Sequence, residues 1–382
     1  MTIRAIDLFA GAGGTSTGLA LAAASLGSRV SLAAVDHWPI AVETHALNHP
    51  WAEHHCAAID SLDPQRVARG KVDLLVASPE CTHHSNARGG KPINDQSRAS
   101  AWCVVRWAEA LRPRVVLVEN VPEFQTWGPL TMRGQRMKGR AGETFEAWRN
   151  ALHAIGYRTA ARVLNCADYG DATTRRRLFV LAWRGNCAAP WPVESHAERG
   201  SGDLFAARKP WRPAREVIDW TIAGRSIFGR KKPLAEATLA RIADGLRRFG
   251  GRDLQPFVLG QQSGAIARPV SDPLPTLATS GAISLIEPFL VTYYGTGTAE
   301  PVSAPVPTIT TKDRFALVEP RLADITLRML APHELSAAMG FPTGYRFAGT
   351  RGEAIKQIGN AVPVSTAQAL CTSILRDALG AA

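Results

Sequence analysis

The chain has 382 residues, of which 46% are hydrophobic and 20% charged, a composition that excludes a disordered or fibrous protein. Its 44 lysines and arginines exceed its 33 aspartates and glutamates, and the net charge of +11 favours a polyanionic partner such as nucleic acid. Because many soluble proteins are basic, this charge excludes few functions, and the motifs must decide.

Short apolar runs alternate with amphipathic segments through the first half of the chain. We predict buried strands at 3–9, 30–35, 72–77, 115–119 and 178–182, and helices at 15–26, 41–47, 99–111 and 144–155. Strands of this kind suit a parallel sheet covered on both faces. The repeating β-α-β order therefore predicts a doubly wound, Rossmann-like α/β domain.

After Trp183 the periodic pattern gives way to segments rich in Pro, Gly, Arg and Lys. We predict a smaller, irregular, β-rich second domain over 186–325. The first domain, 1–185, is completed by 326–382, which packs back on it. From Thr326 onward we expect helices, ending in an apolar helix near 364–379.

The second domain contains a tandem repeat of 32 residues, 256–287 followed directly by 288–319. Both copies begin with Pro-Phe, share the pattern Pro-Val-Ser-x-Pro-x-Pro-Thr, and close with Glu. Two copies are too few for a solenoid. Two interpretations of the repeat are possible from the sequence. It is either a duplicated β-hairpin with a structural role or a pair of related loops that contact DNA.

A glycine-rich turn, Asp7 to Gly14, follows the first predicted strand and opens a helix. Its glycines let the backbone approach a ligand closely, and the helix N-terminus favours negative charge. Asp36 ends the next strand, where an acid can bind ribose hydroxyls. Together they indicate an adenosine-containing cofactor, with a nicotinamide oxidoreductase as one alternative and a structural turn as another.

A cysteine lies just beyond the carboxyl end of the strand 72–77, in the run Ser78-Pro79-Glu80-Cys81-Thr82. Ligands bind at that edge of open α/β sheets, and a core cysteine has no reason to be in a polar turn. We interpret Cys81 as a nucleophile. Glu119 ends the next strand, and Arg175 to Arg177 precede the strand 178–182, so acid and guanidinium groups approach the same edge.

In these motifs, matched in order, the chain resembles the DNA cytosine C5 methyltransferases of bacteria and phages. The resemblance implies Cys81 as nucleophile, Glu119 as the acid, and Arg175 and Arg177 as the paired arginines. It extends to Leu330–Glu334, to Met339–Pro342 and to the closing motif that starts at Gly359.

The resemblance implies S-adenosylmethionine as cofactor, S-adenosylhomocysteine as product, and no metal. The implied cofactor-binding residues are Asp7, Phe9, Ala10, Gly11, Gly13, Gly14, Asp36, His37, Asp60, Ser78, Pro79, Asn360, Ala361 and Val362. The implied DNA-binding residues are Ser85, Arg88 and Arg98, on the loop that closes over DNA in the family.

The implied substrate is double-stranded DNA, with the target cytosine flipped out of the helix and the sequence read by the 186–325 domain. We expect a monomer, located in the cytoplasm on the nucleoid, with a cognate restriction endonuclease as a further partner. The alternatives are an RNA cytosine-5 methyltransferase, a nicotinamide-dependent oxidoreductase and a non-catalytic DNA-binding protein.

The chain departs from the family pattern at several positions. Glu80 and Thr82 flank the cysteine where the family has proline and glutamine, and Thr173 replaces a glutamine before the arginines. Neither Asp60 nor Ala58 aligns cleanly with the family's adenine-binding aspartate.

The remaining signals concern redox state and location. Six scattered cysteines predict no structural disulfides, and His54-His55-Cys56 lacks the spacing of a zinc site. The N-terminus shows no charged-then-apolar leader, and no apolar run is long enough to span a bilayer. We therefore expect a soluble, intracellular protein.

Overall fold

The computed structural model describes residues 1–79, 96–131, 137, 139–198, 208–223, 225–226, 228–233, 236, 257–260, 268–269, 283–284, 289–292, 299–301, 303–306, 308, 315–321 and 324–381. The chain forms two compact units. Unit 1 comprises Met1–Arg212, Val306–Thr311 and Ser336–Ala382, and unit 2 comprises Pro213–Pro305 and Lys312–Leu335.

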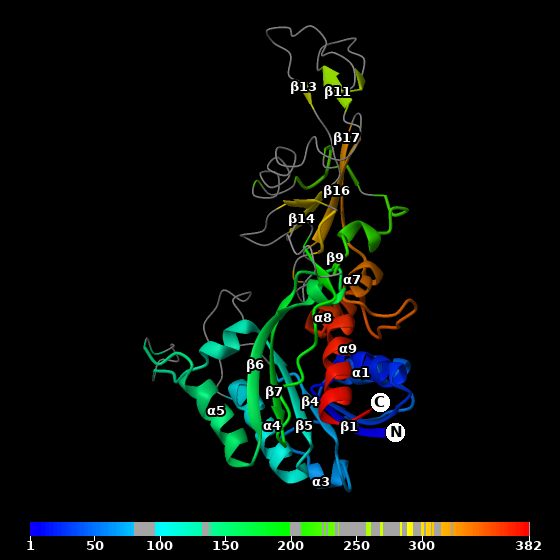
Figure 1. Cartoon of the computed structure of the whole chain (residues 1–382). Coiled ribbons are helices and arrows are strands. Elements are labelled where there is room, and N and C mark those ends of the chain that lie inside the picture. The colour runs from blue at the N-terminus through cyan, green and yellow to red at the C-terminus, as the bar shows by residue number, and fades with distance from the viewer. Residues whose placement is uncertain are drawn as a thin grey trace. The chain divides into compact units, whose positions relative to one another are not determined.

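Unit 1 is built on a seven-stranded sheet of order β3-β2-β1-β4-β5-β7-β6 (Figure 1). The first five strands of this order, from β3 to β5, all pair in parallel. Strand β7 runs antiparallel to both of its neighbours, β5 and β6. The strands are β1 (Thr2–Leu8), β2 (Arg29–Asp36), β3 (Glu53–Cys56), β4 (Leu74–Ala77), β5 (Val115–Asn120), β6 (Arg158–Asn165) and β7 (Arg176–Trp183).

Helices cover both faces of this sheet because its central strands are apolar on both sides, β5 being buried along its whole length. One face packs on a cluster that contains Trp107 of α4 and Trp148 of α5, and the other on Leu19 of α1 and Leu370 of α9. The helices of unit 1 are α1 (Gly14–Ser25), α2 (Pro39–Asn48), α3 (Pro64–Val67), α4 (Gln96–Leu111), α5 (Glu143–Ala154), α8 (Arg351–Asn360) and α9 (Val364–Ser373).

Short elements complete unit 1. Two strands, β8 and β9, pair in parallel, and single turns of 3-10 or π-helix connect the larger elements. Their bounds are β8 (His196–Ala197), β9 (Lys209–Pro210), η2 (Pro122–Thr126), η3 (Cys166–Tyr169) and η5 (Ile374–Ala378).

Unit 2 contains a five-stranded sheet of order β10-β17-β16-β14-β15 and a three-stranded sheet of order β12-β11-β13. The strands are β10 (Arg225–Ser226), β11 (Phe257–Gly260), β12 (Arg268–Pro269), β13 (Ile283–Ser284), β14 (Phe289–Thr292), β15 (Ala299–Pro301), β16 (Phe315–Arg321) and β17 (Asp324–Met329). η4 (Ala214–Glu216) precedes them, and α7 (Pro332–Ala338) follows.

A buried ion pair organises unit 2 beside β17. Arg328 Nη1 lies 2.8 Å from Glu334 Oε2, and Glu334 is fully buried. The same guanidinium donates to the carbonyls of Asp219 and Ile222, and Glu334 Oε1 accepts the Asp219 N–H at 2.8 Å. The pair thus ties the 219–222 turn to the segment that leads into α7.

The predicted strands and helices of the first half are present, with ends shifted by a few residues. Two strands were not predicted: β3 (Glu53–Cys56) is a polar edge strand, and β6 is mostly half-buried, so neither shows a buried apolar run. The sheet is also not wholly parallel, because β7 follows β6 through the tight turn of η3 rather than through a helix.

The expectation of helices from Thr326 is wrong at its start, because Asp324–Met329 pairs with β16 as β17. The predicted division at 185/186 falls inside unit 1. Residues after 186 are held there by Asp168, whose Oδ1 accepts Trp211 Nε1–H at 2.8 Å and whose carbonyl accepts the Ser195 N–H at 3.0 Å.

Candidate active site

Polar side chains from several strands meet at one edge of the unit 1 sheet. Asp36, Ser78 and Glu119 lie at or just beyond the carboxyl ends of β2, β4 and β5. Arg177 lies at the amino end of β7. Because β7 is antiparallel to β5, its first residues lie at the edge where β5 ends. The strand order therefore brings Arg177 close to Glu119.

The pairing register explains why Glu119 and Arg177 touch. Glu119 is opposite Phe179, and Arg177 lies two residues before it, so the two side chains are diagonal neighbours on one face. Arg177 Nε lies 3.1 Å from Glu119 Oε1, and the two side chains are only 13% and 10% exposed. Arg175 is buried nearby, at 2% exposure.

Burial and charge act on Glu119 in opposite directions. Loss of solvent raises the pKa of the Glu119 carboxyl, while the nearby guanidinium groups of Arg177 and Arg175 lower it, and burial prevails. A carboxyl group with a raised pKa is suited to hold and deliver a proton.

The ends of β4 and β5 are tied together by a side chain. Asn120 Nδ2 donates to the carbonyl of Pro79 at 3.1 Å, and Asn120 Oδ1 accepts the Val121 N–H. Ser78 N–H donates to the Leu8 carbonyl, which fixes the start of the following segment. Cys81 comes two residues after Pro79 and, with Ser85 and Arg88, lies outside the described residues.

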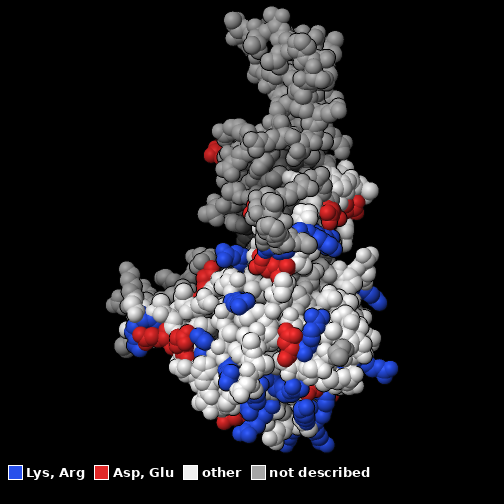
Figure 2. Space-filling model, in the orientation of Figure 1, with Lys and Arg blue, Asp and Glu red and all other residues white. Residues whose placement is uncertain are grey.

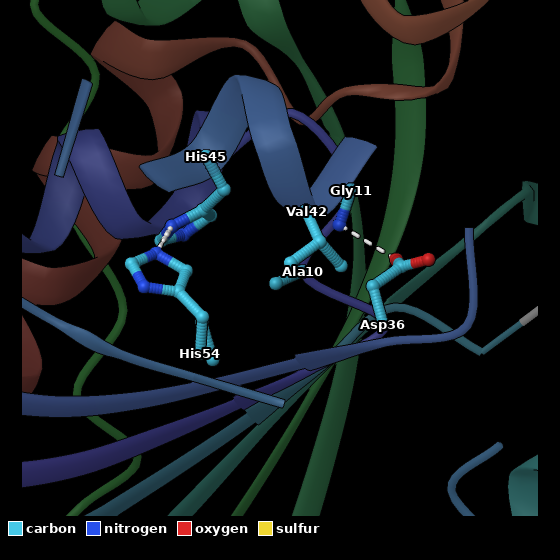
Figure 3. A pocket seen from close by; sticks show the side chains of 7 residues that line it. Ala10, Gly11, Asp36, Val42, His45 and His54 are labelled. Carbon is cyan, nitrogen blue, oxygen red and sulfur yellow. Dashed lines mark hydrogen bonds between the residues drawn. The ribbon is translucent and has the colours of Figure 1, made fainter. Parts of the chain in front are cut away.

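On the neighbouring side of the edge, the glycine-rich turn bends sharply around Asp36 (Figure 3). Phe9 has φ 58°, a left-handed conformation rare for a side chain of its size, which indicates a functional constraint. Asp36 Oδ2 accepts the Gly11 N–H and Oδ1 accepts the Trp38 N–H, both at 2.8 Å. A small pocket here is lined by Ala10, Gly11, Ala34, Asp36, Val42, His45 and His54.

These residues fit an adenosine-containing cofactor. Each Asp36 oxygen uses one lone pair on a backbone N–H, which fixes the carboxylate and leaves further lone pairs for a pair of ribose hydroxyls. Ala10 and Gly11 present almost no side chain to the pocket, so a ligand can approach the backbone closely.

A chain of hydrogen-bonded polar side chains runs from the pocket lining to α1, and all of its members except the half-buried His54 are buried. Ser16 Oγ donates to Asp7 Oδ2 at 2.6 Å, His45 Nε2 lies 2.9 Å from Ser16 Oγ, and His45 Nδ1 lies 2.9 Å from His54 Nε2. Burial raises the pKa of Asp7 to about 7 and lowers that of His45 to about 2. Asp7, which the sequence predicts to bind cofactor, thus faces Ser16 and α1 and is 2% exposed.

The closing segment packs against the glycine turn. A Cβ on Gly14 would lie 2.2 Å from the Val362 carbonyl oxygen, and one on Gly18 would lie 2.5 Å from the Ala367 side chain. These glycines therefore allow helix α1 to meet the start of α9. Ala361 and Val362 are buried in this contact, whereas Asn360 is exposed.

A buried aspartate joins this segment to the arginine turn, and the sequence did not reveal it. Asp171, fully buried, accepts the N–H groups of Ser365 at 3.1 Å and Thr366 at 3.0 Å, and the Thr366 hydroxyl at 2.7 Å. It thereby binds the N-terminus of α9, 194 residues away. No local pattern marks such a partner.

Three further predicted residues are exposed or have no described side chain. His37 is exposed, with Nδ1 3.8 Å from Asp36 Oδ1, and Asp60 is exposed after β3. Arg98 belongs to α4, and its side chain is not among those described. Cofactor roles for His37 and Asp60 therefore remain predictions.

A model of the C-5 cytosine-specific DNA methylase family matches residues 3–201 and 280–376. The chain belongs to this family. The Type II methyltransferase M.XorII of Xanthomonas oryzae pv. oryzae is 27% identical, over 97% of this chain and 84% of that one. M.HhaI of Haemophilus parahaemolyticus is 23% identical, over 97% and 94%. M.AgeI of Thalassovita gelatinovora is 30% identical, but the match spans 51% of this chain and only 42% of M.AgeI.

Solved structures support the methylase fold. A putative DNA modification methyltransferase encoded within an E. coli prophage aligns with TM-score 0.59 at 18% identity, over 98% of this chain and 99% of its own. A DNMT2 mutant from Spodoptera frugiperda aligns with TM-score 0.62 at 15% identity, over the same shares. The predicted family, the Rossmann-like fold and the reaction class, methylation of DNA cytosine at C5, are confirmed.

The remaining observations concern the cofactor, membrane helices, metal ligands, cysteines and surface charge. S-adenosylmethionine is the cofactor that the family implies. Within the described residues, no helix is long and apolar enough to cross a membrane, and no cluster of metal-ligating side chains is found. Cys56, Cys103, Cys166, Cys187 and Cys371 are free thiols. On the face that Figure 2 shows, basic and acidic side chains are mixed over much of the described surface, and several basic ones lie together at its lower end.

Proposed function

We propose that the chain methylates C5 of a flipped cytosine within a specific sequence of double-stranded DNA, with Cys81 as nucleophile. The observation that carries this proposal is the buried Glu119–Arg177 pair, 3.1 Å apart, at the sheet edge from which Ser78 and Pro79 lead to Cys81. S-adenosylmethionine supplies, when bound, an electrophilic methyl group on a sulfonium.

The reaction needs covalent activation because C5 of cytosine is a poor nucleophile. The Cys81 thiolate adds to C6, and Glu119 delivers a proton to N3, so that C5 gains the electron density to attack the methyl group. Arg177 holds O2 of the base, and Arg175 supports that arrangement. The new C5–methyl bond would replace the methyl–sulfur bond of the cofactor, which would leave as S-adenosylhomocysteine. The C5 proton is then lost to water, its electron pair re-forms the C5–C6 double bond as Cys81 leaves as thiolate, and N3 returns its proton to Glu119.

Asp36 and the glycine turn would hold the cofactor. In the proposal, Asp36 accepts the ribose hydroxyls, while Phe9, Ala10 and Gly11 line the approach. The other cofactor-binding residues expected from the sequence complete the set: Asp7, Gly13, Gly14, His37, Asp60, Ser78, Pro79, Asn360, Ala361 and Val362.

In the proposal, different parts of the chain read the DNA sequence and carry out the chemistry. Residues 186–325, which include the 186–212 segment of unit 1, read the DNA sequence, and 1–185 with 326–382 carry the chemistry. Ser85, Arg88 and Arg98 contact DNA. The enzyme acts as a monomer in the cytoplasm, and a restriction endonuclease that cuts the same sequence is its proposed partner, since M.XorII and M.HhaI are Type II methyltransferases.

The experiment measures transfer of a tritiated methyl group to cytosine-containing DNA and RNA by the wild type and by Cys81→Ala. We expect transfer to DNA by the wild type and none by the variant, which should still bind cofactor and DNA. DNA with 5-fluorocytosine should trap the wild type as a denaturation-stable adduct, because fluorine cannot leave as a proton does. Turnover by Cys81→Ala, or transfer to RNA alone, would refute the proposal.

A further inference from the structure

The 32-residue repeat of unit 2 is repeated in strand pairing as well as in sequence. In the first copy (256–287), β11 pairs antiparallel with β12 so that Phe257 is opposite Pro269. In the second copy (288–319), β14 pairs antiparallel with β15 so that Phe289 is opposite Pro301. Both partners are shifted by 32 positions, so the two hairpins have the same register.

The third strand of each copy follows the same rule. Gly260 of β11 is opposite Ile283 of β13, and Thr292 of β14 is opposite Phe315 of β16. Again each partner is displaced by 32 positions. Each copy therefore forms one antiparallel three-stranded module with its first strand in the centre, and we name these the first and second modules (Figure 1).

The two modules are attached to the rest of the chain differently. In the second, β16 continues to Arg321 and pairs with β17, which pairs with β10, so this module belongs to a five-stranded sheet. Among the described residues, the first module is a separate three-stranded sheet. The second module is thus integral to the larger sheet of unit 2, whereas the first pairs with no other strand among the described residues.

A second contact distinguishes the second copy. Its Val306, fully buried, forms a parallel bridge with Thr173, donates its N–H to the Ala172 carbonyl, and accepts the Thr174 N–H at 2.9 Å. These residues directly precede Arg175. Val306, which belongs to unit 1, therefore supports the arginine turn of the proposed active site.

The charge of the two copies does not favour phosphate binding, and their sequences differ. Together they hold more acidic than basic residues: Asp272, Glu287, Glu300, Asp313 and Glu319 against Arg268, Lys312 and Arg314. Between the repeated positions their sequences differ, with Gln261-Gln262-Ser263 in the first copy and Tyr293-Tyr294-Gly295 in the second. A constant scaffold with varied polar side chains is the arrangement that sequence readers use.

We propose that the first module is a DNA-reading element that specifies part of the methylated sequence, whereas the second copy, through its Val306, supports the arginine turn. This inference rests on the proposed function of the chain as a sequence-specific DNA methyltransferase. It predicts that the first copy can be removed without loss of methyl transfer, but with loss of discrimination.

The chain allows a clean deletion. Removal of 256–287 joins Gln255 to Pro288, and because both copies begin with Pro-Phe, the sequence across the junction is unchanged. The matched control keeps the full length and replaces 256–287 with a second copy of 288–319, which preserves the module but changes its sequence. Wild type and both variants are expressed in a host free of DNA methylation, and 5-methylcytosine is mapped across the genome.

We expect the deletion to methylate a broader set of sequences, with selectivity reduced roughly 5- to 150-fold for each base pair no longer read. We expect the full-length control to methylate a set that differs from that of the wild type. An unchanged recognition sequence in both variants would overturn the inference. So would loss of all methylation in both while they still bind S-adenosylmethionine.

If the deletion alone is inactive, the first copy is required for methyl transfer and that part of the inference is overturned. The full-length control then tests the reading role, which a changed sequence supports and an unchanged one overturns. Failure of the proposed function would look different. In that case the wild type itself would leave no 5-methylcytosine at any sequence.

Discussion

Two groups of buried acids lie at the same edge of the unit 1 sheet, and their surroundings differ. Glu119 faces the guanidinium of Arg177 at 3.1 Å, with Arg175 close by. Asp7 instead meets the Ser16 hydroxyl, and Asp36 meets two backbone N–H groups. The first group, the base side, has cations that offset a change of charge during reaction. The second, the cofactor side, uses neutral donors that fix its acids in place.

The largest effect is expected on the base side, from Glu119→Gln. This substitution keeps shape and hydrogen bonding but removes the transferable proton, and general acid catalysis contributes about 100- to 10,000-fold. We expect kcat to fall by that factor, with little change in DNA affinity. Because burial raises the pKa of Glu119, the wild-type rate should decline as pH rises through that pKa, while the residual rate of the variant should not.

The matched control is Glu143→Gln, an acid on the surface of α5 that pairs with Arg140 at 2.6 Å. It should leave the rate and its pH profile unchanged. If Glu119→Gln retained most of the activity, Glu119 would not be the proton donor.

The next largest effect concerns the stability of the cofactor side, which should depend on pH through Asp7. Burial raises the pKa of Asp7 from 3.8 to about 7, so folding favours its neutral form. That contribution is full below the unfolded pKa and is lost as pH rises through the folded value. A shift of this size corresponds to about 4 kcal/mol at most.

Asp7→Asn mimics the neutral acid at every pH. We expect the free energy of unfolding of the wild type, relative to the variant, to fall between pH 4 and pH 8. Urea unfolding at several pH values measures this difference. A constant difference would show that Asp7 is ionised in the folded protein.

The sequence could predict this edge only in part. Asp36, Glu119 and Arg177 were found because each adjoins a short apolar run, and strand ends of a doubly wound sheet coincide at one edge. Asp171 and His45 were missed because their partners come from tertiary packing: Thr366 lies 195 residues from Asp171, and His45 bonds Ser16 of another helix. The 32-residue repeat was visible, but the register that its two copies share depends on backbone pairing, which residue types do not reveal.

A smaller effect is expected from Asp36→Ala. If the carboxylate accepts two ribose hydroxyls, its loss leaves them unpaired, and S-adenosylmethionine affinity should weaken by about 1–3 kcal/mol. Calorimetry on Asp36→Ala and on Asp36→Asn, which keeps one acceptor oxygen, should give a graded loss. Equal affinity in all three proteins would place the ribose contact elsewhere.

The smallest effect is expected from Tyr345→Phe, which tests how far the cofactor side depends on the segment between α7 and α8. The Tyr345 hydroxyl donates to the Ala12 carbonyl at 2.5 Å and lies 3.3 Å from His49 Nε2, so it holds the glycine turn from outside. Burial raises the pKa of this hydroxyl, so it remains a neutral donor at any working pH.

Loss of one such hydrogen bond costs about 0.5–1.5 kcal/mol. We expect a cofactor affinity lowered about 2- to 10-fold and a kcat at saturating cofactor close to that of the wild type. A variant with unchanged affinity but a reduced kcat would show instead that the turn acts on the base side, and would remove the distinction between the two groups of acids.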